Sequence, residues 1–195
     1  MNGTLVYEDY LSLYNNNKKK SLSFNKSQIQ PSSIDLSLSE ECYEIKTSFL
    51  SPDNKVRDKL KKIYSKKLSL INSKIFKKNK TYIVRLNENL NLKDSIFGHC
   101  NPKSSTGRID IFCRTIVDYT DEYEKIPKNY KGEIFLEVTS RSFNILLKSG
   151  DKLNQLRLIY NKHQYYLDSE LEELHDKEKI IFEKNSNIKI DNGLK

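Results

Sequence analysis

Three short segments in the second half of the chain carry residue types that could do chemistry. Residues 101–108 (NPKSSTGR) offer hydroxyls, a lysine and an arginine, with a glycine that lets the backbone turn tightly, and such groups are typical of a phosphate-binding loop. Residues 130–137 (YKGEIFLE) read as a strand that places a carboxylate, Glu137, among apolar residues. Residues 150–156 (GDKLNQL) read as a turn that leads into another strand. A phosphate loop beside a carboxylate able to move protons indicates nucleotide chemistry.

Alternating apolar residues predict the strands that would position these segments. Ile134, Leu136 and Val138 point to one face of their strand. Glu137 points to the other face, together with Phe135, which can help to exclude water from it. Further strands are predicted at residues 33–38, 43–45, 82–86, 96–100, 109–117, 143–147 and 153–160. Many short strands separated by turn residues favour a mainly β fold, a sandwich or barrel with a few peripheral helices.

Three helices are predicted around these strands. The first covers residues 4–14, and the second covers residues 53–72 after a capping serine and a proline at the first helical position. The lysine-rich faces of the second helix are interpreted as solvated rather than as a nucleic-acid surface, because no aromatic residues are interleaved to stack on bases. The third helix covers residues 169–177 behind a capping box, and residues 180–182 offer one more strand.

Composition narrows the class of protein. With 195 residues and 36% hydrophobic residues, we expect one domain or one with appendages. The net charge of +8 is read mainly as a solvated surface, and an anionic partner, nucleotide phosphates or nucleic acid, is the alternative. Three widely spaced cysteines, Cys42, Cys100 and Cys113, predict free thiols in a reducing compartment. With no apolar run of membrane-spanning length and no signal peptide, we expect a cytoplasmic protein without a membrane partner.

Four motifs in a fixed order carry a resemblance to a known family. They are residues 30–36 (QPSSIDL), 101–108 (NPKSSTGR), 130–133 (YKGE) and 150–156 (GDKLNQL). Their order and spacing resemble the dUTPase/dCTP deaminase superfamily. The first two runs are most similar to the long 2′-deoxycytidine 5′-triphosphate deaminases of alphaproteobacteria, and the resemblance covers nearly the whole chain.

The resemblance implies a dUTPase-like distorted β-barrel (β-clip) over residues 1–178, with the N-terminal helix and the helix at 53–72 as additions. It also implies a homotrimer with nucleotide sites between subunits, and the hydrolysis of dCTP to dUTP and ammonia. Mg²⁺ is expected to be carried by the triphosphate, with no metal ligand from the protein and no catalytic zinc. The sequence agrees on zinc, because it lacks the His-x-Glu and Pro-Cys-x-x-Cys patterns of zinc deaminases, and adjacent His99 and Cys100 do not readily make a tetrahedral site.

The resemblance also assigns catalytic roles. Glu137 matches the glutamate that takes a proton from the water attacking C4 of the base and returns it to the ring nitrogen and the leaving amine. Arg108 matches an arginine near the reacting centre, a fixed cation that can orient this glutamate and offset developing negative charge. Ser104 matches the serine that helps to place the attacking water.

Other matched residues concern the phosphates and the base. Lys103 and Ser105 match phosphate contacts, and Gln155 matches a glutamine near the phosphates. Asp35 matches an aspartate that is mainly structural or part of the metal–phosphate environment. The charged insert at residues 114–127, longer than in short deaminases, lies where the pyrimidine-reading hairpin is expected, and Asp118 is the candidate there.

Three alternatives to a dCTP deaminase remain open. In dUTPases an aspartate five residues before the glycine of the Tyr-x-Gly motif activates water, and here that position is Pro127, which disfavours a dUTP diphosphatase or bifunctional enzyme. Residues 179–195 resemble the linker into the second β-domain of the long deaminases, so the chain is alternatively a partial or non-catalytic half-domain that assembles with such a domain. A nucleic-acid-binding module has only the lysine excess in its favour, and we predict no nucleic-acid partner.

Overall fold

The computed structural model describes residues 2–15, 23–93, 95–163 and 165–180 and divides into two compact units, Met1–Lys162 and His163–Lys195. The second unit contains helix α4, Asp168–Lys177, which matches the helix predicted at 169–177. The sequence placed the boundary at residue 178. The interpretation of residues 179–195 as a linker stays a prediction, because residues 181–195 lie outside the described part of the chain, and so does most of the strand expected at 180–182.

The first sheet in the first unit is antiparallel and runs in the order β10-β8-β13-β3-β2, with β1 paired to β13. Because β13 lies between β3 and β8, it brings the first, second and fourth sequence motifs to one sheet. Its strands are β1 (Gly3–Thr4), β2 (Ile29–Gln30), β3 (Ser33–Leu36), β8 (Ile96–Pro102), β10 (Lys125–Ile126) and β13 (Asn154–Tyr160).

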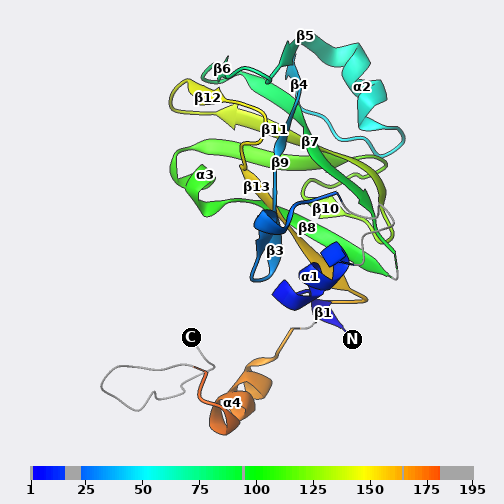
Figure 1. The fold of residues 1–195 in the computed structure, drawn as a ribbon, viewed down its shortest axis with the longest axis vertical. Helices are drawn as coiled ribbons and strands as arrows, with labels where there is room; N and C mark the ends of the chain where they lie inside the picture. The colour runs from blue at the N-terminus through cyan, green and yellow to red at the C-terminus, as the bar shows by residue number, and fades with distance from the viewer. Residues whose placement is uncertain (1, 16–22, 94, 164, 181–195) are drawn as a thin grey trace. The chain divides into compact units, whose positions relative to one another are not determined.

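The second sheet is also antiparallel, in the order β5-β4-β7-β11-β9. Its strands are β4 (Leu38–Ile45), β5 (Tyr64–Ser69), β7 (Thr81–Asn91), β9 (Ile111–Val117) and β11 (Lys131–Ser140). A separate two-stranded sheet pairs β6 (Lys74–Phe76) with β12 (Ile145–Leu147). The labels of α2, β5 and β6 lie at one end of this unit and those of α1 and β1 at the other (Figure 1). The mainly β fold predicted from the alternation is confirmed.

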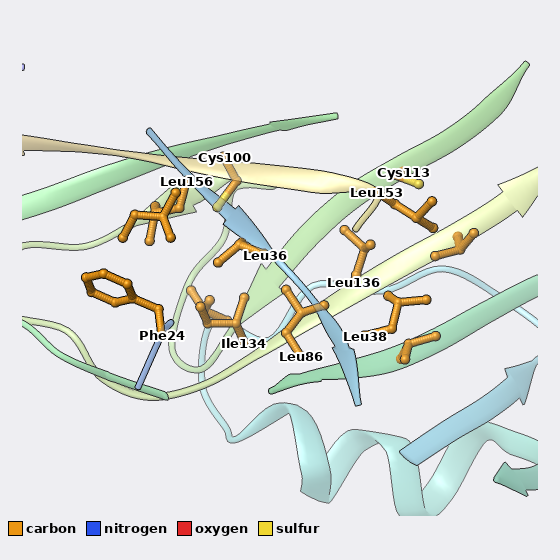
Figure 2. Packing of buried hydrophobic residues seen from close by; sticks show 14 of the residues in the cluster. Phe24, Leu36, Leu38, Leu86, Cys100, Cys113, Ile134, Leu136, Leu153 and Leu156 are labelled. Atoms are coloured by element: carbon orange, nitrogen blue, oxygen red, sulfur yellow. The ribbon is translucent and has the colours of Figure 1, made fainter. Parts of the chain in front are cut away.

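The main hydrophobic core joins side chains from both sheets. Figure 2 shows Leu36 of β3 in this core together with Ile134 and Leu136 of β11. The predicted alternation of β11 is therefore confirmed. Phe135, on the opposite face, packs into a second buried cluster beneath α2 (Val56–Ile63). Because β11 is covered on both faces, its polar side chains lie in a buried environment, which matters for Glu137 below.

The prediction of one helix over residues 53–72 was wrong. The helix ends at Ile63, and the chain continues directly into β5, which pairs with β4 so that Leu68 lies opposite Cys42. The ring of Tyr64 packs edge-on against Tyr43, with 5.5 Å between ring centroids. The open edge of β4 offers backbone hydrogen bonds to this segment, and such non-local pairing leaves no trace in the local helical period.

Two helix starts also differ from prediction. Ser51 does not cap α2, because its hydroxyl donates to the carbonyl of Asn54 (2.7 Å) and the helix starts only at Val56. The first helix, α1, covers Tyr7–Asn15, since Gly3–Thr4 pairs with β13 instead. A further short element, the 3-10 turn η2, covers Lys26–Gln28, and α3 covers Ser104–Arg108. No described helix is long and apolar enough to cross a membrane. The three cysteines are free and buried, as predicted for free thiols.

An ion-pair network joins α2 to the second sheet. The Arg57 guanidinium donates to both carboxylate oxygens of Glu41 (2.7 and 2.9 Å) and also binds Glu133, which Arg85 contacts at 2.7 Å. The hydrogen bonds from Arg57 are the largest cause that holds the pKa values of Glu41 and Glu133 below their usual range, and the bond from Arg85 adds to the effect at Glu133. A carboxylate with a lowered pKa stabilises the fold above its unfolded-state pKa of about 4.3, and this stability is lost as the pH falls through the folded-state value.

We therefore expect Arg57→Met to lower the free energy of unfolding near neutral pH and to reduce the loss of stability between about pH 5 and about pH 3. Urea unfolding at several pH values measures both effects. Lys61→Met, which removes an exposed pair with Asp58 on the same helix, is the matched control and should change neither. An unaltered acid dependence in Arg57→Met would show that the network does not link folding to pH.

Candidate active site

A cavity of about 520 Å³ opens beside β9 and β11 and contains Glu137 in its wall. The strands supply most of this wall, because β11 lies between β7 and β9 and directs alternate side chains toward the cavity. Other lining residues include Thr81 of β7, Phe112, Cys113 and Arg114 of β9, Thr139 of β11 and, after β11, Arg141.

Glu137 is buried and ion-paired. It lies directly opposite Arg114 in the β11–β9 register, and Arg114 Nε donates to Glu137 Oε1 at 2.7 Å. The Glu137 side chain is 2% exposed and that of Arg114 is 27% exposed. The second oxygen, Glu137 Oε2, is buried without a hydrogen-bond partner among the described residues. One oxygen is thus fixed by a cation, and the other makes no hydrogen bond within the described part of the chain.

Sequence reasoning missed Arg114. The signal was present, because Arg114 is the one cation in the mostly apolar segment predicted as a strand at 109–117, whose other charge, Asp110, lies near its start. A buried strand keeps such a charge only where a partner compensates it. Its partner is not readable from local sequence, since the pairing with Glu137 depends on the register between two strands.

The segment predicted as a phosphate loop is a single helical turn, α3. The backbone N–H of Lys103 and the hydroxyl of Thr106 both donate to the carbonyl of Leu153, at 2.9 and 3.0 Å, which anchors α3 to the chain before β13. Arg108 is exposed and donates to the Ser104 hydroxyl at 3.2 Å, within the same turn.

The cavity at Glu137 includes two residues of this region, Pro102 and Gly107. The other predicted catalytic and phosphate-binding residues are not part of its lining; they are Lys103, Ser104, Ser105, Arg108 and Gln155. Their roles stay predictions, and within one chain the cation that contacts Glu137 is Arg114, not Arg108.

Three sequence motifs meet on the first sheet. Lys103 Nζ is ion-paired with Asp35 Oδ2, and Ser33 Oγ donates to Gln155 Oε1 at 3.3 Å. Gln155 lies opposite Asp35 in the β13–β3 register. The Lys103 ammonium and the Gln155 amide could contact phosphate oxygens, whereas Asp35 offsets the positive charge of Lys103 and is nearly buried.

Asp118, the predicted base-reading residue, is engaged in capping α2. Its Oδ1 accepts a hydrogen bond from the backbone N–H of Val56 at 2.8 Å, and burial raises its pKa. The Tyr130 hydroxyl accepts from the N–H of Asp118 and donates to the carbonyl of Glu133. A Cβ at Gly132 would lie 2.5 Å from this hydroxyl, which explains why the Tyr-x-Gly motif needs glycine. A role for Asp118 in base reading stays a prediction.

We expect Asp118→Ala to lower the free energy of unfolding by about 1 kcal/mol, because the N-terminal N–H of α2 loses its acceptor. Asp118→Asn keeps an acceptor oxygen and should lose less. Chemical unfolding of both variants checks this order. Equal and negligible losses would contradict the capping role, and a change in nucleotide preference without a loss of stability would favour base reading instead.

Glu124 is a second unusual acid in the insert. Burial is the main cause that raises its pKa to about 7, against hydrogen bonds from Thr115 and Asn154 that lower it. Because the folded state holds this proton more tightly than the unfolded state, the group makes stability fall as the pH rises from about 4.3 to about 7. We expect Glu124→Gln to remove this fall in urea unfolding between about pH 5 and about pH 8, whereas the exposed control Glu122→Gln keeps it. A wild-type pH dependence in Glu124→Gln would exclude the linkage.

The described residues contain no group of three or more His, Cys, Asp or Glu side chains placed to hold a metal ion. Zinc-independent chemistry and Mg²⁺ carried by a triphosphate stay predictions.

The family model that matches this chain covers the unit that contains the candidate site. The model of the 2′-deoxycytidine 5′-triphosphate deaminase (DCD) N-terminal domain matches residues 1–162. The fold is similar to the crystal structure of 2′-deoxycytidine 5′-triphosphate deaminase from Agrobacterium tumefaciens, with a TM-score of 0.85 and 33% identity. That similarity covers 94% of this chain and 56% of the Agrobacterium chain, so this chain spans only about half of that relative. A native EIAV dUTPase is similar with a TM-score of 0.38 and 18% identity, over 62% of this chain and 83% of that one. Among curated proteins no sequence match was found.

Proposed function

Since the chain belongs to the family of 2′-deoxycytidine 5′-triphosphate deaminase N-terminal domains, we propose that it hydrolyses dCTP to dUTP and ammonia. The observation that carries the proposal is the buried carboxylate of Glu137 in the cavity wall, with Oε1 bound by Arg114 and Oε2 without a partner among the described residues. Such a group can accept and return a proton in a site of limited water access. The product dUTP would serve cytoplasmic synthesis of thymidine nucleotides.

The proposed reaction needs one proton shuttle. Water adds to C4 of the cytosine ring while Glu137 Oε2 takes its proton and delivers it to N3. The tetrahedral intermediate then collapses: the remaining hydroxyl proton passes to the amino group through Glu137, the C4–N bond breaks, ammonia leaves and the C4 carbonyl of uracil forms. Atoms balance with water as the only co-reactant. Arg114 keeps Glu137 in place through both transfers.

Residues of α3 would complete the site from another copy of the chain. Ser104 and Arg108 are exposed and outside the lining of the Glu137 cavity, so we propose that a neighbouring copy in a homotrimer supplies them to place the water and offset charge. Lys103, Ser105 and Gln155 would hold the triphosphate. Mg²⁺ bound by the triphosphate would neutralise part of its charge, and it needs few protein ligands because it keeps several waters.

The decisive test measures two products from two nucleotides. We expect ammonia from dCTP, dependent on Mg²⁺, and no pyrophosphate from dUTP. Pyrophosphate from dUTP without ammonia from dCTP would overturn the proposal in favour of a diphosphatase. Ammonia release that appears only after addition of a protein carrying the remaining domain would support the half-domain alternative, which the 56% coverage of the Agrobacterium chain favours.

Mixing two inactive variants tests the assembly. Glu137→Gln loses the proton shuttle in every copy, and Arg108→Ala loses the proposed contribution of α3. If each site combines Glu137 of one copy with α3 of another, unfolding and refolding the two variants together should restore part of the activity. Absence of restoration, with mixed oligomers present by mass spectrometry, would place the whole site within one chain.

A further inference from the structure

Arg114 rests on an aromatic side chain from the insert. Its guanidinium carbon lies 3.8 Å from the centroid of the Tyr123 ring and 5.2 Å from that of Phe112. A guanidinium that close to an aromatic ring is attracted by the negative face of the ring and by planar stacking. Tyr123 therefore limits the orientations open to Arg114, which makes the ion pair with Glu137.

Tyr123 is itself held from two sides. Its hydroxyl donates to the carbonyl of Phe49 at 3.3 Å. The next residue, Glu124, donates its backbone N–H to Thr115 of β9 at 3.0 Å and accepts from the N–H of Cys100 of β8 at 2.7 Å. The ring position is thus fixed by hydrogen bonds to both sheets and to the segment before α2.

The charges of Glu137 and Arg114 also act on the Tyr123 side chain. Burial raises its pKa, the negative charge of Glu137 raises it further, and the positive charge of Arg114 opposes this. At neutral pH the ring is therefore neutral and cannot act as an anionic partner that competes with Glu137 for Arg114. Tyr123 therefore interacts with Arg114 through the face of its aromatic ring.

We propose that Tyr123 and Arg114 are positioning residues for Glu137: Tyr123 fixes the plane of the Arg114 guanidinium, and Arg114 fixes Oε1 of Glu137 so that Oε2 faces the reacting base. The inference rests on the proposed function. It gives the insert at residues 114–127 the role of supporting the proton shuttle. This role differs from the predicted role of the insert in base reading.

Kinetics of ammonia release test the pair. Tyr123→Leu removes the aromatic face and should lower kcat about 10-fold, with KM within about twofold, because one cation–aromatic contact is lost. Tyr123→Phe keeps the face and should retain most of the activity. Tyr119→Leu, at an exposed tyrosine of the same insert, is the matched control and should behave like the wild type.

Chemical rescue separates positioning from a general loss of structure. Arg114→Ala should lower kcat about 100-fold through misplacement of Glu137. Added guanidinium chloride at millimolar concentration should restore part of this loss, whereas sodium chloride at the same concentration should not. Wild-type kcat in Tyr123→Leu, or equal effects of the two salts on Arg114→Ala, would overturn the proposal while leaving the deaminase function in place.

A double-mutant cycle decides the inference even if the chain releases no ammonia. The cycle combines Tyr123→Leu with Glu137→Gln and measures unfolding equilibria, first with Arg114 present and then in Arg114→Met. We expect a coupling of about fivefold in the unfolding constant that vanishes without Arg114. Coupling that persists in Arg114→Met, or none in either background, would show that Tyr123 does not act on Glu137 through Arg114.

Discussion

Replacing Glu137 with glutamine is expected to lower the rate of ammonia release from dCTP by about 10²–10⁴-fold. The amide has nearly the shape of the carboxylate, but it cannot take the proton of the attacking water. It also removes the negative charge that Arg114 Nε contacts at 2.7 Å. Because the contact is charge-assisted and Glu137 is buried, stability should fall by about 1–3 kcal/mol, so activity is to be compared at a temperature where both proteins remain folded.

Two further variants sharpen this result. Glu137→Asp keeps the acid and shortens the side chain by one methylene, so it should retain more activity than Glu137→Gln if proton transfer is the role. Glu122→Gln removes an exposed carboxylate that pairs with Lys125 and should leave the rate unchanged. Full activity in a folded Glu137→Gln protein would remove Glu137 from the mechanism, and equal losses in the Asp and Gln variants would indicate a positional rather than an acid–base role.

The strand that carries Glu137 was predictable because every second residue along one of its faces is apolar, although both faces are buried. Ile134, Leu136 and Val138 of β11 all enter the main core, as the alternation required. The stretch at residues 64–69 was not predictable by the same means. Most of its side chains are exposed, so no period-two pattern marks it as a strand, and only the free edge of β4 determines its conformation.

In the candidate site, the sequence indicated which residue could do chemistry but not which residue would contact it. Glu137 could be picked out as a carboxylate in an apolar strand, and it is found buried in a cavity wall. The expectation that Arg108 orients it came from motif matching, whereas the contact in this chain comes from Arg114 across the β11–β9 register. Tyr123 was hidden in a charged insert, and its place against Arg114 depends on the hydrogen bond that it donates to the carbonyl of Phe49 and on those that Glu124 makes with Thr115 and Cys100.

A second carboxylate, Glu88, is nearly as deeply buried as Glu137 but serves the fold. It lies on β7 between Leu86 and Leu90, so the alternation of that strand directs it into the interior, where it is 3% exposed. It accepts hydrogen bonds from Gln28 Nε2 (2.6 Å), the Ser37 hydroxyl (2.7 Å) and the Ser37 backbone N–H (3.0 Å). Ser37 is the residue between β3 of the first sheet and β4 of the second, so Glu88 fastens the point where the chain passes from one sheet to the other.

Glu88→Leu is therefore expected to lower the free energy of unfolding by about 3–5 kcal/mol, because three buried donors lose their acceptor at once. Glu88→Gln keeps one acceptor oxygen, and its amide can donate to the Ser37 hydroxyl, so the loss should be smaller. Urea unfolding of both variants measures the difference, with Glu40→Leu, at an exposed position on β4, as the matched control. A loss in Glu88→Leu no larger than in Glu40→Leu would mean that the crossover at Ser37 holds without its carboxylate. A loss larger in Gln than in Leu would mean that desolvating a polar group at this position outweighs the hydrogen bonds it makes.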